Sequence, residues 1–439
     1  MIAKKDSSLN CLIERIFVIY EYTSLGTQIQ LYDLRSNTKM SPKKIDKKLT
    51  DPKFKSFKDT YPHCAFALAL ALIYPNRKNF RNRMICIFAV IVLNTPNLLW
   101  FSMYLFKCLR ILDMFNLARN ITIGVLICIF FFKSFYVNYK NDLFGELLGK
   151  ISEDLLKGND MAEDYQEIYE QYIQLGKFSE ALWIIIPMFL SSQFPIYAAV
   201  TMIIESVKSD TGTRYMVHEM DLKYIEDIQY ESPYFEVLWA YNLLPCIVLM
   251  LNFVGFDGSF CIATTHLRLK LKLMSHKLYR AFKDSSNRNE LEAKVKDVIK
   301  DHQGSLQFYN HLQNLYGGWL LVVFLLTSLI ISMNVYQIYL CQQIHPKYTI
   351  FAVSGMIHMF APCYFSSKLE KAGEDFSASI YCVAWEKWAD PSVTKLLIFM
   401  IAKSQQPLIL TGKGMVYINM QLFVSVLQTS YSFFTLISS

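Results

Sequence analysis

The sequence predicts an all-α membrane protein with seven transmembrane helices, and three observations support this. Of its 439 residues, 53% are hydrophobic and 18% are charged, whereas soluble domains are about 45–50% apolar and about 25% charged. The apolar residues gather in runs near the length of about 20 residues that a spanning helix needs. Lysine and arginine gather between alternate runs. Together these patterns indicate one polytopic domain.

The runs follow a basic N-terminal segment, residues 1–83, which we expect to be cytoplasmic. Within it, the apolar stretch 64–74 is too short to cross a bilayer and indicates a packed helix. The spans are predicted at residues 84–109, 121–137, 181–204, 234–264, 319–340, 350–365 and 415–437.

Two charged residues fall within these spans. Lys133 lies near one end of the second span, where its long side chain is expected to reach water. Asp257 lies at the inner end of the fourth span, and a charge inside a membrane usually has a partner. We expect that partner to be a cytoplasmic cation such as Arg268.

The distribution of positive charge predicts the orientation. Segments 1–83, 138–180, 265–318 and 366–414 hold 36 of the 44 lysines and arginines, whereas the segments on the opposite side hold 7. Because cytoplasmic loops are rich in lysine and arginine, the N-terminus is predicted inside and the C-terminus outside. An internal N-terminus disfavours a G-protein-coupled receptor.

The cytoplasmic segments carry helical patterns of their own. In residues 139–180 and 265–316, apolar side chains recur at three- and four-residue intervals between charged faces. We expect helices that extend from spans 1–6 (residues 84–365) and join residues 366–414 in a cytoplasmic anchor bundle. Residues 415–439 form the seventh span. The alternative is a set of solvated loops.

Motifs of enzymes and metal sites are missing from the sequence. It has no Walker loop, no GxSxG, no HExxH and no CxxC pair among its ten cysteines. We therefore expect no enzyme activity, no cofactor and no bound metal. The net charge of +7 follows the membrane topology, so nucleic acid is not an expected partner.

The C-terminal segment SASIYCVAWEKWADPSVTKLLIFMIAKSQQPLILTGKGMVYINMQLFVSVLQTSYSFFTLIS resembles the signature of insect odorant receptors. The matching positions are Tyr381, Trp385, Trp388, Gln406, Pro407, Gly412 and residues 430–436. The resemblance implies an odorant-specific (tuning) subunit, because the long insertion of the shared co-receptor is missing. It also implies a heterotetramer with that co-receptor, forming an odorant-gated, non-selective cation channel in the plasma membrane of the olfactory dendrite.

The resemblance places the ligand, a small neutral volatile, between the outer halves of spans two, three, four and six. Those halves offer Ile121, Val125, Ser191, Phe194, Tyr197, Ala198, Tyr234, Leu238, Tyr241, Asn242, Phe351 and Ser354. The last span is expected to line the pore, with Ser430, Phe433, Phe434 and Ile437 at the pore and gate. Its hydroxyls can face water, and its apolar residues can close the pore by dewetting.

Two other functional interpretations of the sequence remain open at this point. One is a gustatory-type seven-span receptor channel, which shares the topology and part of the C-terminal motif. The other is a seven-span receptor that is not a channel, which an external N-terminus would favour.

Overall fold

Helices make up most of the protein. The computed structural model describes residues 52–75, 80–208, 213–218, 220–341, 346–388 and 390–438, and the expectations for residues 1–51 lie outside this part. The described elements are α2 (Phe57–Thr60), α3 (Pro62–Leu70), α4 (Phe80–Ile111), α5 (Met114–Tyr139), α6 (Asn141–Lys157), a 3-10 turn (Gly158–Asp160), α7 (Glu163–Lys208), α8 (Tyr234–Asn252), a π-helical segment (Phe253–Asp257), α9 (Gly258–Asp284), α10 (Arg288–Leu340), α11 (Pro346–Tyr381), a second 3-10 turn (Trp385–Lys387), α12 (Pro391–Ser404), β1 (Thr411–Gly412), β2 (Val416–Tyr417) and α13 (Met420–Ser438).

Six helices in the described part of the chain are long and apolar enough to cross a membrane. They are α4, α5, α7, the continuous rod of α8, π segment and α9, then α10 and α11, and they match the first six expected spans in order. The seventh expected span corresponds to α13, which has 19 residues and is not among the six. The protein is therefore a multi-pass membrane protein, and a seventh crossing and the sidedness of its ends stay predictions.

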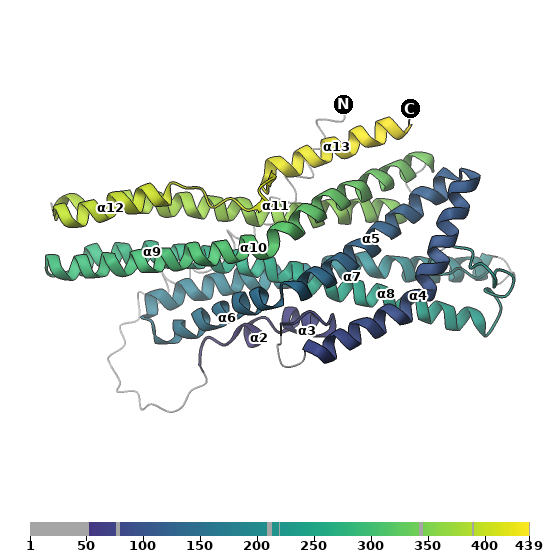
Figure 1. Cartoon of the computed structure of the whole chain (residues 1–439), viewed down its shortest axis with the longest axis horizontal. Coiled ribbons are helices and arrows are strands. Elements are labelled where there is room, and N and C mark those ends of the chain that lie inside the picture. Colours follow the sequence, from purple (N-terminus) through teal and green to yellow (C-terminus); the bar gives the residue numbers. More distant parts are fainter. Residues whose placement is uncertain are drawn as a thin grey trace.

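The longest helices extend far beyond a bilayer. Helix α10 has 53 residues, which at 1.5 Å per residue is about 80 Å, compared with about 30 Å for the hydrocarbon core. Its N-terminal half runs beside α9 and the C-terminal half of α11, and α12 packs against α10 and α11 at the same end (Figure 1). In the 139–180 region, a 3-10 turn at Gly158–Asp160 separates α6 from α7.

The turn between α9 and α10 shows how the sequence forms this bundle. Asn287 caps α10 by accepting a hydrogen bond from the backbone N–H of Glu290 at 2.9 Å. The Glu290 carboxylate accepts one in return from the backbone N–H of Ser286 at 2.9 Å. This reciprocal arrangement satisfies N–H groups that a helix start leaves unpaired, and it lets Leu278 and Leu291 meet in the core on either side of the turn.

Ion pairs tie α6 to α9. Asp154 of α6 lies 2.6 Å from Lys270 and 3.3 Å from His266, both on α9. Burial alone raises the pKa of Asp154, but the hydrogen bonds and positive charges of His266 and Lys270 outweigh it and hold that pKa well below its usual range. The carboxylate therefore stays charged at neutral pH and links the two helices.

The π-helical segment packs closely against α3. The Cys64 thiol donates a hydrogen bond to the carbonyl oxygen of Gly255 at 3.3 Å. A Cβ atom on Gly255 would lie 2.9 Å from the backbone nitrogen of Leu68. Only glycine lets the two backbones come this close.

We therefore expect Gly255→Ala to destabilise the protein by about 1–3 kcal/mol, the usual cost of overpacking a core. The measurement is the melting temperature of detergent-solubilised receptor. Gly304→Ala is the matched control, because a Cβ there meets no atom within 4 Å and alanine favours a helix. Equal melting temperatures for Gly255→Ala and wild type would show that the two backbones can separate freely.

Candidate ligand pocket and buried ion cluster

An apolar pocket of about 120 Å³ lies between α4, α5, α7 and α8. Most of its lining is aliphatic or aromatic, including Leu126, Phe130 and Leu249. The polar exceptions are Asn94, Asn97, Ser191 and His218. A protein cavity of about 150 Å³ can hold benzene, so this pocket suits a molecule of about six non-hydrogen atoms. An apolar cavity with a few polar groups is the usual form of a small-molecule site.

Some of the expected ligand residues lie at this pocket. Ser191 and Phe194 line it from α7. Phe351 of α11 packs against Phe194, with ring centroids 5.6 Å apart, so it lies just behind the pocket wall. Ser354, one turn further along α11, is buried.

The other expected residues lie elsewhere. On α5, Val125 is buried in the hydrophobic core, and Ile121 is partly buried and packs against that core. On α7, Ala198 is buried and the Tyr197 ring lies 5.5 Å from the Lys347 ammonium. On α8, Tyr234 is exposed and Asn242 is buried. The Tyr241 hydroxyl donates a hydrogen bond to the carbonyl oxygen of Leu93. Leu238 packs against a small buried cluster, which consists of Tyr104, Cys108, Met220 and Leu222.

The pocket is thus lined by span one, whereas span six was expected. Five of its lining residues come from α4, among them Asn94 and Asn97, whereas none of the expected ligand residues belongs to that span. A signal was present, because two amide side chains three residues apart in an apolar span lie on one helix face and intramembrane polar groups tend to be functional.

The expected pore residues lie on α13, which packs against α10 and α11. Ser430 is buried and its hydroxyl donates to the carbonyl oxygen of Ser328 at 3.3 Å. The Phe434 ring lies 5.5 Å from that of Tyr339 on α10. The side chains of Phe433 and Ile437 lie outside the described residues.

The opposite face of α13 is exposed and polar. It carries Gln421, Ser425, Gln428, Ser432 and Thr435. Their spacing of three or four residues places them along one helix stripe. No residue of this stripe is charged.

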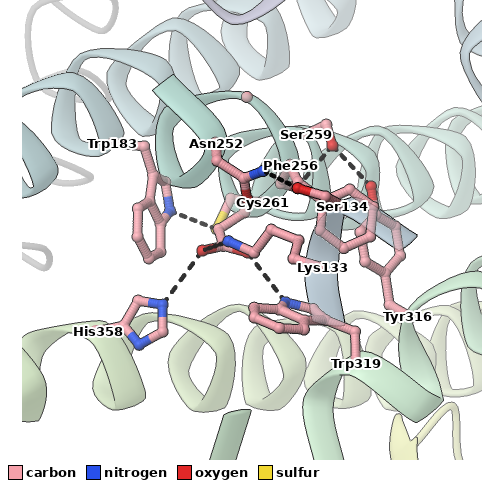
Figure 2. Close-up of polar contacts among 12 residues, drawn as sticks. Lys133, Ser134, Trp183, Asn252, Phe256, Ser259, Cys261, Tyr316, Trp319 and His358 are labelled. Atoms are coloured by element: carbon pink, nitrogen blue, oxygen red, sulfur yellow. Dashed lines mark hydrogen bonds and ion pairs between the residues drawn. The ribbon is translucent and has the colours of Figure 1, made fainter. Parts of the chain in front are cut away.

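A cluster of charged side chains lies buried among the membrane helices (Figure 2). The Lys133 ammonium of α5 lies 2.9 Å from the carboxylate of Asp257 in the π segment. The indole N–H of Trp319 on α10 donates to the same carboxylate at 3.0 Å, and Nε2 of His358 on α11 lies 3.2 Å from it. Lys133 is 0% exposed, Asp257 5% and His358 7%.

Aromatic rings complete the surroundings of the lysine. Its ammonium lies 3.9 Å from the centroid of the Phe253 ring and 4.4 Å from that of Trp319. Cation–π attraction of this kind is strongest where water is excluded. The cluster therefore joins α5, the π segment, α10 and α11 through one desolvated carboxylate.

This arrangement corrects two expectations. Lys133 does not reach water, because its partner lies inside the bundle, and Asp257 pairs with Lys133 instead of Arg268. Sequence distance hid the pair, since 124 residues separate the two side chains. Asp257 is the last residue of the π segment, and all five residues of that segment are buried.

The chain is similar to known proteins in sequence and in fold. A 24% identical stretch of 235 residues matches odorant receptor 10 of Aedes albopictus, covering 52% of this chain and 61% of the relative. Odorant receptor 30a of Drosophila melanogaster is 25% identical over 235 residues, covering 51% of this chain and 59% of the relative. The match thus spans less than two thirds of either relative's length.

The fold is similar to that of olfactory receptor OR5 from Machilis hrabei, solved in complex with eugenol. The TM-score is 0.70 at 15% identity, over 86% of this chain and 97% of the other. The sequence profile of the 7tm odorant receptor family matches residues 113–431, which is most of the chain and includes five of the six membrane-capable helices. The chain belongs to the 7tm odorant receptor family.

Proposed function

We propose that this chain is the odorant-binding subunit of a ligand-gated, non-selective cation channel, acting as a receptor and not as an enzyme. The observation that carries the proposal is the apolar pocket of about 120 Å³ between α4, α5, α7 and α8, in a chain of the odorant receptor family. The relative of similar fold was solved with eugenol, which supports a small organic ligand here too.

The ligand is a small neutral volatile. Among the described residues, no lysine or arginine lines the pocket, so a carboxylate would lose its hydration without gaining a counter-charge from either residue type. Ser191 and Phe194 contact the ligand directly. Phe351 does not line the pocket, but its ring packs against that of Phe194.

The channel is a heterotetramer with the odorant co-receptor in the plasma membrane of the olfactory dendrite, and α13 is the seventh span and lines its pore. The uncharged polar stripe of α13 supports this role, because its side chains are exposed on the surface of the subunit and suit a water-filled path. The gate lies at the outer turns of α13, where the exposed side chain of Leu436 borders the stripe and can exclude water from a narrow pore. Ser430 holds α13 against α10.

Whole-cell current tests this proposal. Cells that express the chain with an insect co-receptor are expected to pass a rapid inward cation current when a neutral volatile from a broad panel is applied. Cells with either subunit alone are the controls. Co-assembled receptors on the surface that pass no current with any volatile would contradict the proposal, and an external N-terminal tag would then favour a receptor of another class.

A further inference from the structure

Two asparagines one turn apart on α4 face the pocket, and their amide N–H groups differ in one respect. The side-chain N–H of Asn94 donates to the carbonyl oxygen of Val90 at 2.8 Å, within its own helix. The side-chain nitrogen of Asn97 is buried and has no acceptor within the described part of the chain. The pocket that Asn97 lines is otherwise mainly apolar.

A buried N–H group without an acceptor is costly, because it has left water and gained nothing in return. Structures usually satisfy such groups with protein, water or ligand. A water molecule needs two to four polar partners, and the lining around Asn97 is supplied mostly by Val90, Ile91, Leu98 and other apolar side chains. A ligand that brings one acceptor and is otherwise apolar meets both requirements of this site.

We propose that Asn97 donates a hydrogen bond to a carbonyl oxygen of the ligand. The pocket then selects small volatile ketones, aldehydes and esters over hydrocarbons of the same shape. This inference rests on the proposed role of the pocket as the odorant site and adds the chemical class of the odorant. It also assigns a specificity-determining residue to span one.

A pair of isosteric volatiles tests it. In 2-pentanone the acceptor oxygen occupies the place that a CH₂ group takes in 2-methyl-1-pentene, and both molecules have about the six non-hydrogen atoms that the cavity admits. The concentration for half-maximal current is measured for each with wild type, Asn97→Leu and Asn94→Leu, all co-expressed with the co-receptor. Dividing each variant's value by that of wild type cancels differences in volatility and solubility.

Asn97→Leu is expected to raise the half-maximal concentration of 2-pentanone about tenfold, which is the loss of one hydrogen bond, and that of the alkene less than about twofold. Asn94→Leu is the matched control, because it makes the same change one turn away at an amide that is already paired. It is expected to change both concentrations by the same factor.

Equal loss for ketone and alkene in Asn97→Leu would overturn the assignment. Where Asn97→Leu does not reach the cell surface, Asn97→Ala replaces it, and the same two ratios to wild type decide. Wild-type currents with equal ketone and alkene losses in the variant overturn only the role of Asn97. No current with any volatile overturns the proposed function, and this inference with it.

Discussion

Asp257→Ala is expected to remove most of the receptor from the cell surface. The substitution leaves the Lys133 ammonium fully buried without its counter-charge and takes the acceptor from Trp319 and His358. Breaking a buried pair in this way costs about 3–5 kcal/mol, compared with a total stability of about 5–15 kcal/mol for a typical protein. Surface labelling and the melting temperature of solubilised receptor measure the loss.

Two further variants serve as controls for the loss of the buried charge pair. Asp221→Ala breaks a pair of similar length, 2.7 Å to Lys107 compared with 2.9 Å for the buried pair. The side chains of Asp221 and Lys107 are 45% and 49% exposed, so a loss of about 1 kcal/mol or less is expected. The double variant Lys133→Leu with Asp257→Leu removes both charges and is expected to recover part of the surface level, since apolar residues often replace a buried pair at little cost. Wild-type stability in Asp257→Ala would show that water reaches the cluster.

Ser191→Leu is expected to weaken the odorant response more than about tenfold while leaving the folded receptor on the surface. Ser191 lines the pocket from α7, and a leucine side chain there would fill much of a cavity of about 120 Å³. The half-maximal odorant concentration is expected to rise more than about tenfold, because a ligand must then displace packed side chains. Dose–response currents of cells with the co-receptor measure it.

Ser192→Leu is the matched control for this effect. It makes the same substitution at the next position of α7, where the hydroxyl donates to the carbonyl oxygen of Phe189 and the residue is not part of the pocket lining. Its dose–response curve is expected to match wild type. Equal losses in the two serine variants would indicate a general effect on α7, and no loss in either would place the odorant site elsewhere.

The six long apolar helices follow directly from the sequence, because the bilayer demands a run of apolar residues whatever their partners are. The helical nature of the 265–316 region was equally readable, since its apolar spacing and the break at DSSNRN are local signals. The family was readable from the C-terminal motif, which spans positions such as Tyr381 and Pro407. These features depend on short-range properties of the chain.

The ligand pocket was readable only in part. Ser191 and Phe194 share one face of an expected span, which spacing alone can indicate. Asn94 and Asn97 belong to a helix whose hydropathy is typical of a membrane span. Their amides line a cavity only because this helix packs beside α5, α7 and α8. The side of α13 that is exposed likewise depends on how the helix packs against α10 and α11.

The sequence by itself determined the membrane class, the order of the first six spans and the family, because hydropathy, helical period and motif spacing are properties of contiguous segments. Only the tertiary structure decided which charges pair and which helices enclose the cavity. Lys133 and Asp257 meet across 124 residues of chain because α5, the π-helical segment, α10 and α11 converge at one point. Such a meeting is set by packing among helices, and no single segment carries a signal for it.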